Sequence, residues 1–390
     1  MTAIARIEAR HLGRSPLLWA GLALALPLLY LELNSNWPAL AGDDLLAYRG
    51  LSLIGGGALL AGAWLALRDR ATGAADLVAV TPTAPWRLQG ARLASVATVA
   101  AGVFAAGFAV ALAISALRGG RGTPDLRLLA DGMLAMVLSG WVGVAVGRLS
   151  GSRMVAVLAA PVWVAACLLG PMVLSEYYLP VQRLLPVLTS ERRSAAFGFL
   201  PDALWPHLGY LAGVILLAGV LLLALAARGR AQRPPLAPTL AAGLAGLLLV
   251  GMSGSRLAAL PDMELVVGPG AADRRAASVP DVPDRPSVFP ADDRARACAG
   301  DATLEVCVYP AYGAGLATFI HAGMDPAARL LAGLPGIPTR ARMVPSDQWR
   351  GACSGTEVQV PEGTGRAAAN GGGDASRKSH WASVYLGCAL

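Results

Sequence analysis

The stretch 93-LASVATVAAGVFAAGFAVALAISAL-117 contains no charged residue in 25 consecutive positions. About 20 consecutive apolar residues form a helix long enough to cross the hydrocarbon core of a membrane. Comparable runs cover residues 17–33, 50–67, 128–147, 154–174, 208–227 and 238–257. The stretch is therefore the third of seven predicted spans, of which the seventh is the weakest because Arg256 lies at its end.

The composition of the whole chain agrees with this interpretation. Its 390 residues are 55% hydrophobic and 15% charged, and the mean hydropathy is +0.54, whereas a soluble domain is about 25% charged. The net charge of +7 does not indicate a nucleic-acid partner, because most arginines flank apolar runs. We expect an all-α polytopic bundle of six to seven transmembrane helices in the cell (plasma) membrane, in contact with lipid.

The short loops predict the orientation of the bundle. Loops on the side of the N-terminus carry twelve Arg residues, and the alternate loops carry seven. Cytoplasmic loops of membrane proteins are the more basic ones. The N-terminus is therefore predicted to be cytoplasmic, and seven spans place the residues after 260 outside the cell.

The composition changes after residue 260. Residues 261–297 are rich in Pro, Asp and Arg and predict a linker, and residues 298–390 predict a small α+β domain. Within it, 303–310 predicts a strand, 324–336 a separate short helix, and 380–390 a strand. Four cysteines of this domain are typical of a disulfide framework in an oxidising compartment, with three connectivities open; they are Cys298, Cys307, Cys353 and Cys388. Free or metal-binding thiols are the alternative, although no CxxC pair occurs.

Few residues in the predicted spans suggest chemistry. No ionisable residue lies near the middle of a span, and Asp131 and Arg148 lie near span ends. Ion-coupled transporters usually place ionisable residues inside the membrane, so the pattern argues against one. The four histidines stand apart, and the chain contains no HExxH, GxSxG or P-loop motif. We therefore expect no enzyme, no catalytic residue, no metal site and no cofactor of its own.

Two polar segments interrupt the apolar pattern. The segment between spans five and six contains aromatic and proline residues, and we interpret it as an interfacial anchor or as a gate over an exit path. The segment 68-RDRATGAADLVAVTPTAPWRLQGAR-92 predicts a short helix over 69–80, a break at the prolines and a second helical start. Taken alone, this second segment is an interfacial connector.

Together with 5-ARIEARHLGRSP-16, the segment 68–92 resembles the permease subunits of ABC-2 type (export-type) ABC transporters. The resemblance covers residues 1–230. It implies a cytoplasmic amphipathic helix over 1–16, a six-helix permease domain over 17–230, and a segment 68–92 that docks on a separate P-loop ATPase chain, which would bind the ATP. It also implies a homo- or heterodimer of permease chains. By position, the residues expected to contact the ATPase are Asp69, Asp76, Leu77, Val78 and Pro82.

Two features depart from the six-span core of that family, namely the seventh span and the external domain. They support an alternative function, in which the chain is a membrane-anchored extracytoplasmic binding or sensory protein without transport activity.

Overall fold

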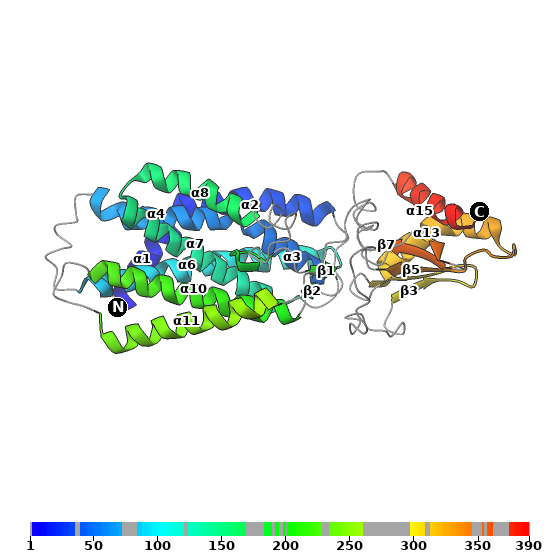
Figure 1. Ribbon diagram of the computed structural model, residues 1–390. Helices are drawn as coiled ribbons and strands as arrows, with labels where there is room; N and C mark the ends of the chain where they lie inside the picture. The colour runs from blue at the N-terminus through cyan, green and yellow to red at the C-terminus, as the bar shows by residue number, and fades with distance from the viewer. Residues whose placement is uncertain are drawn as a thin grey trace.

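The computed structural model describes residues 2–35, 40–71, 84–120, 124–168, 183–188, 192–194, 198–199, 201–227, 234–259, 297–308, 313–344, 353–354, 357–361 and 374–389. These residues form two bodies, a long helix bundle and a smaller α/β body (Figure 1). Each body has its own hydrophobic core, one within residues 12–222 and the other within residues 304–385. The two cores share no residue.

The bundle consists of helices that follow one another along the chain. They are α1 (Thr2–Gly13), α2 (Pro16–Ser35), α3 (Leu40–Leu51), α4 (Ile54–Ala71), α6 (Pro85–Leu117), α7 (Leu126–Ser150), α8 (Arg153–Leu168), α10 (Pro201–Ala227) and α11 (Leu236–Ala259). A two-stranded antiparallel hairpin, β1 (Arg192–Ser194) and β2 (Gly198–Phe199), lies between α8 and α10 in the sequence.

By length and composition, five described helical stretches can cross a membrane: Leu46–Arg68, Pro85–Leu117, Leu126–Ser150, Ala203–Ala227 and Leu236–Ala259. Helices α1 and α2 pass the same test together, with a bend of 50° between them. The described part of α8 has 16 residues and is shorter than a span. The structure thus confirms a helical bundle with membrane-length helices at five of the seven predicted positions.

Small residues bring α4 and α7 into close contact. A Cβ atom added to Gly143 would lie 2.7 Å from the carbonyl carbon of Leu59, and one added to Gly147 would lie 2.6 Å from the carbonyl oxygen of Ala63. In membranes, small residues at a helix interface allow two backbones to approach closely. Only glycine fits these two positions unless α4 and α7 move apart.

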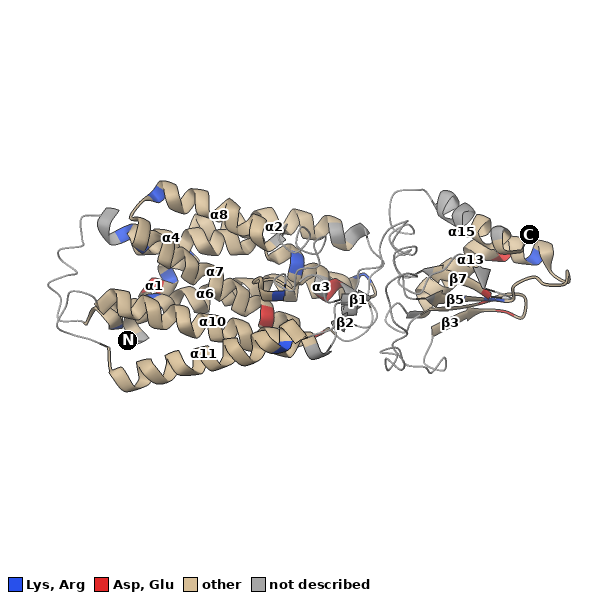
Figure 2. Cartoon of the chain, in the orientation of Figure 1, with Lys and Arg blue, Asp and Glu red and all other residues tan. Residues whose placement is uncertain are grey.

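Charged residues lie toward the two ends of the bundle (Figure 2). We call one end the basic end; it contains the C-termini of α4 and α7 and the N-termini of α6 and α8, with Arg68, Arg87, Arg92, Arg148 and Arg153. We call the opposite end the far end; it contains the N-termini of α3, α7 and α10, with Asp43, Asp44, Asp125 and Asp131.

The second body has a mixed five-stranded sheet in the order β3-β4-β5-β7-β6. Its strands are β3 (Ala297–Gly300), β4 (Glu305–Val308), β5 (Arg340–Val344), β6 (Cys353–Ser354) and β7 (Glu357–Pro361). Strand β4 runs parallel to β5, and β5 runs parallel to β7, whereas β3 and β6 are antiparallel edge strands. Helices α13 (Gly313–Leu331) and α15 (Asp374–Ala389) pack on one face of the sheet (Figure 1).

Two local predictions for this body are wrong. Residues near 380–390 form helix α15 instead of a strand, because Trp381 and Tyr385, one turn apart, both pack into the core. Helix α13 continues through Pro326, where a new short helix was expected. Because Pro326 has no N–H group, the carbonyl group of Ala322 receives no helical hydrogen bond. Both residues are exposed, so water can donate to that carbonyl instead. The strand predicted near 303–310 is confirmed as β4.

Candidate functional sites at the two ends of the bundle

The far end contains a buried polar network built from three helices. His207 of α10 approaches Asp131 of α7, with 2.6 Å between Nδ1 and a carboxylate oxygen, Oδ1. The hydroxyl of Tyr48, on α3, donates to the other carboxylate oxygen of Asp131 at 2.5 Å. The side chains of Asp131 and His207 are fully buried, and Tyr48 is 1% exposed. Burial of an ionisable pair is costly unless every polar atom is hydrogen-bonded, and this network meets that condition.

The same network binds the backbone of the short segment 183–188. Nε2 of His207 lies 2.9 Å from the carbonyl oxygen of Leu185, and the amide of Leu188 donates to the Tyr48 hydroxyl at 2.9 Å. Val187 and Leu188 are buried in the core of the bundle. The side chain of Arg183 is buried too, and it donates to the carbonyl oxygen of Leu257, in the last turn of α11, at 2.9 Å.

Further contacts tie together the helix ends around this network. Ser115 of α6 donates to Asp43 of α3, and the amide of Asp125 donates to Asp44 at 2.8 Å. Asp125 also caps the N-terminus of α7 by accepting from the amide of Arg127 at 2.9 Å. Burial alone would raise the pKa of Asp125, but the hydrogen bonds from Arg127 lower it below the usual range.

The sequence-based interpretation missed this network. By sequence, Asp131 lies near a span end and His207 stands alone just before span six; in the structure the two side chains are partners. The helix starts indicate how deep each of the two residues lies, but not that the two helices are neighbours. Pro201 is a favoured first residue of a helix, and α10 begins there, so His207 lies inside the helix at a depth similar to that of Asp131 in α7.

At the basic end, α1 holds two helices together through one carboxylate. Glu8 of α1 is 5% exposed, and it accepts two hydrogen bonds from Arg68 near the end of α4, at 2.7 and 2.8 Å. Nε of Arg92, in α6, lies 3.9 Å from the same carboxylate. Ser95 of α6 donates to the backbone carbonyl of Ala5 at 2.7 Å. Helix α1 therefore lies against α4 and α6 and links them.

Arg68 and Arg92, which both face Glu8, lie at the two ends of the segment that is predicted to contact an ATPase. Residues 72–83, which include Asp76, Leu77, Val78 and Pro82, lie outside the described residues. Asp69 lies in the last turn of α4, and its side chain also lies outside the described part. No contact of the five predicted residues is therefore described. The structure does show that both helices flanking residues 72–83 face Glu8: Arg68 of α4 donates two hydrogen bonds to its carboxylate, and Arg92 of α6 forms a longer ion pair with it at 3.9 Å.

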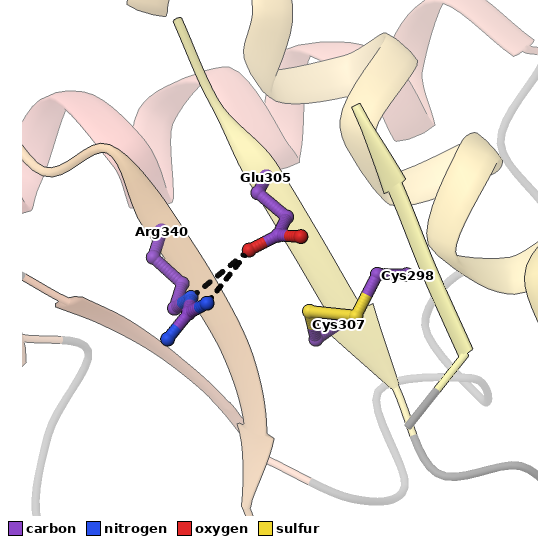
Figure 3. The surroundings of a disulfide bond; sticks show 4 residues. All are labelled: Cys298, Glu305, Cys307 and Arg340. Carbon is purple, nitrogen blue, oxygen red and sulfur yellow. Dashed lines mark hydrogen bonds and ion pairs between the residues drawn. A yellow bond between two sulfur atoms is a disulfide. The ribbon is translucent and has the colours of Figure 1, made fainter. Parts of the chain in front are cut away.

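The second body contains one of the predicted disulfides. Cys298 and Cys307 face each other across β3 and β4 and are bonded (Figure 3). Cys388 is also disulfide-bonded, and the side chain of Cys353 lies outside the described residues. Cys167 in α8 is free and buried, as is usual for a cysteine that packs as a small apolar residue.

An open hollow of about 610 Å³ lies beside this disulfide. Its lining includes Cys298, Asp301 and Glu305, and Glu305 pairs with Arg340 of the neighbouring strand at 2.9 Å (Figure 3). Hydrogen bonds from the amides of Thr303 and Leu304 lower the pKa of the Asp301 carboxyl. The hollow is thus polar and charged.

A group of possible metal ligands lies close to this hollow: Asp301, His321 and Asp325. The guanidinium of Arg329 already bonds both carboxylates, at 2.8 Å from Asp325 and 3.3 Å from Asp301. The positive charge of this group opposes the entry of a cation, so the geometry fits a surface ion-pair cluster.

Comparison of the chain with protein-family models, with curated proteins and with solved structures gave no match.

Proposed function

We propose that this chain is the membrane-spanning permease subunit of an ATP-driven ABC-type exporter, and that it couples to a separate ATPase chain through residues 68–92. The observation that carries the proposal is the contact of Glu8 with Arg68 and Arg92, because these two arginines border that segment. The basic end of the bundle is then the cytoplasmic one, in line with the greater number of basic residues in cytoplasmic loops.

The contacts around Glu8 suggest how force from a partner would enter the bundle. A partner that moves residues 72–83 pulls directly on α4 and α6, and Glu8 adds α1 to the moving unit. The close contact between α4 and α7 at Gly143 and Gly147 passes the movement to α7. Interfaces packed in this way move as rigid bodies between discrete arrangements, which is the motion that an exporter requires.

Co-purification and crosslinking test the proposal. An ATPase chain should co-purify with the full-length protein and form a crosslink to Asp76→Cys. Ser152→Cys is the matched control, since Ser152 follows α7 at the same end of the bundle and lies outside the segment; it should form no crosslink. Failure to recover any ATPase subunit, or equal crosslinking at both positions, would contradict the proposal.

Glu8→Gln provides a second test of the same site. The variant keeps the shape of the side chain but removes the charge that Arg68 and Arg92 face. It should still bind the ATPase, while the substrate-dependent stimulation of ATP hydrolysis falls. Loss of both properties would indicate that Glu8 is needed for folding of α1 and not for coupling.

The second body supports the alternative, an anchored extracytoplasmic binding or sensory protein. It has its own core and a disulfide next to a charged hollow. Deletion of residues 262–390 distinguishes the two functions, because a permease should keep at least part of its ATPase-linked export, and a sensor should lose its response completely.

A further inference from the structure

We propose that Tyr48, Asp131 and His207 form a latch that holds a single proton and keeps the segment 183–188 inserted in the far end of the bundle. The inference goes beyond the proposed transport function, and it stands whether or not an ATPase partner exists. It concerns the segment 183–188, which lies between α8 and α10 in the sequence and places Val187 and Leu188 in the core.

The directions of the hydrogen bonds determine the number of protons. The carbonyl oxygen of Leu185 accepts only, so Nε2 of His207 carries a hydrogen. The amide of Leu188 donates to the Tyr48 oxygen, so the Tyr48 hydrogen points to Oδ2 of Asp131. One contact remains, between His207 Nδ1 and Asp131 Oδ1 at 2.6 Å, and it requires one proton between the two atoms.

The latch is stable only with one proton between His207 and Asp131. Without the proton, two acceptors would face each other at hydrogen-bonding distance, although both side chains are fully buried. With a second proton, two donors would face each other, and the buried pair would carry a net positive charge. Both states are costly in a medium of low dielectric constant, and separation of the groups relieves them.

The groups that the latch joins belong to different elements, so its opening has a defined result. His207 and Tyr48 each bond the segment backbone, and Asp131 connects the two side chains. Loss of Asp131 leaves both without their shared partner and weakens the grip on Leu185 and Leu188. The segment is also held at its first residue, where Arg183 donates to the backbone carbonyl of Leu257 in α11. This contact acts as the hinge of the segment.

Other ionisable side chains on the elements around the latch have partners elsewhere. Asp43 accepts from Ser115, Asp44 accepts from the Asp125 amide, and Arg127 bonds Asp125. Arg118 and Arg183 bond backbone carbonyls of Leu33 and Leu257, and Arg49 has an interaction of its own. Among the described neighbours without charge, Cys167 and Tyr210 are both neutral at neutral pH. The pair of Asp131 and His207 is therefore where the proton resides.

Asparagine at position 131 provides the decisive comparison. Its amide NH₂ can donate to Nδ1 of a neutral His207, and its carbonyl oxygen can accept from Tyr48. Asp131→Asn thus reproduces every hydrogen bond of the one-proton state without an ionisable carboxyl group. Asp131→Ala removes the bonds altogether.

The experiment measures how fast a cysteine in the segment reacts with a polar maleimide. The full-length chain carries Val187→Cys in a Cys167→Ala background and is placed in lipid nanodiscs, where reagent reaches both membrane faces. Val187 is 2% exposed, so its replacement should react slowly while the segment is inserted. Leu211→Cys, on α10 and also buried, reports whether the whole bundle has opened.

We expect Asp131→Ala to raise the reaction rate at position 187 by about tenfold or more, the scale expected when a buried hydrogen-bonding group loses its partner. Asp131→Asn should react within about twofold of the unsubstituted protein, and Tyr48→Phe, which lacks only a hydroxyl, should fall between the two variants. Position 211 should remain slow in all of them.

Three results would overturn the inference. Equal rates for Asp131→Ala and the unsubstituted protein would mean that the network does not hold the segment. A rate for Asp131→Asn as high as that for Asp131→Ala would mean that charge, and not the one-proton hydrogen-bond pattern, closes it. Faster reaction at both 187 and 211 would mean that the network stabilises the whole bundle. If Asp131→Ala does not fold, Tyr48→Phe and Asp131→Asn decide the question by the same comparison.

Discussion

Gly143→Ala tests whether the bundle depends on direct backbone contact between α4 and α7. The added Cβ would lie 2.7 Å from the carbonyl carbon and 2.8 Å from the Cα atom of Leu59. Carbon atoms in favourable contact are about 3.5–4.0 Å apart, so the two helices would have to separate by about 1 Å. The obstacle is backbone, and no side-chain rotation can remove it.

Overpacking of this kind costs about 1–3 kcal/mol. In a domain of this size, such a cost lowers the melting temperature by about 2–12 °C. Cys167 offers an assay, because it is free and buried in the bundle and becomes accessible to a fluorogenic thiol reagent when the bundle unfolds. The melting curve of the full-length protein in nanodiscs would be recorded with this reagent.

Gly102→Ala is the matched control. Gly102 also lies within a membrane-length helix, but a Cβ atom added there meets nothing within 4 Å. Alanine is the better helix former by about 1 kcal/mol, so this variant should melt at the same temperature as the unsubstituted protein or slightly above it. If Gly143→Ala and Gly102→Ala melt together, the close contact between α4 and α7 does not stabilise the bundle, and the route proposed from α4 to α7 loses its basis.

Three further predictions concern the two ends of the molecule. Glu8→Ala should release α1 from Arg68, so that backbone amides of residues 2–13 exchange hydrogen faster while those of α7 do not; unchanged exchange in α1 would contradict the role of Glu8. Replacement of both Cys298 and Cys307 by serine opens a loop with a separation of 9 residues and should destabilise the second body by about 2.5 kcal/mol on the chain-entropy scale, measurable as faster exchange in β4. The pKa of Asp301 is lower in the folded state than in the unfolded state, so its carboxylate stabilises the fold at pH values above the unfolded pKa, and this stabilisation is lost as the pH falls through the folded pKa. Asp301→Asn should remove this acid-dependent part of the stability. The same acid dependence of the denaturation midpoint in both proteins would refute the prediction.

The helices of the bundle could be predicted from the sequence because a long apolar run has few other stable structures in a membrane. The polar network could not, because each of its members was judged against the nearest span end. Asp131 and His207 follow the starts of α7 and α10 by almost the same number of residues, and their pairing depends on two helices that lie side by side in the fold. The pattern of one chain segment contains no information about that neighbour.

The error at the C-terminus had a different origin, because the necessary signal was local. Trp381, Val384, Tyr385 and Cys388 are spaced three and four residues apart, which is a helical period. The mixture of β-branched and aromatic residues favoured a strand, but Trp381 and Tyr385 can both reach α13 only from one face of a helix. Periodicity was the stronger evidence there, and residue type was the weaker.

The two polar clusters lie at opposite ends of a bundle whose centre is apolar, and this separation bears on how one end would affect the other. Glu8 links α1, α4 and α6 at the basic end, and Asp131 links α7, α10 and α3 at the far end. Between them, α4 and α7 touch through glycines, where neither side-chain rotation nor a small compression is available to absorb a displacement. A movement of α4 toward α7 would therefore push on α7, and α7 carries Asp131. A buried hydrogen-bonded pair is sensitive to such a shift, because a separation of about 1 Å already removes most of a hydrogen bond, whereas apolar contacts of the same area would yield gradually. The hydrogen-bonded network at the far end thus suits an element with two arrangements, bonded and separated. The contacts of Glu8 at the basic end suit the transmission of a movement to it.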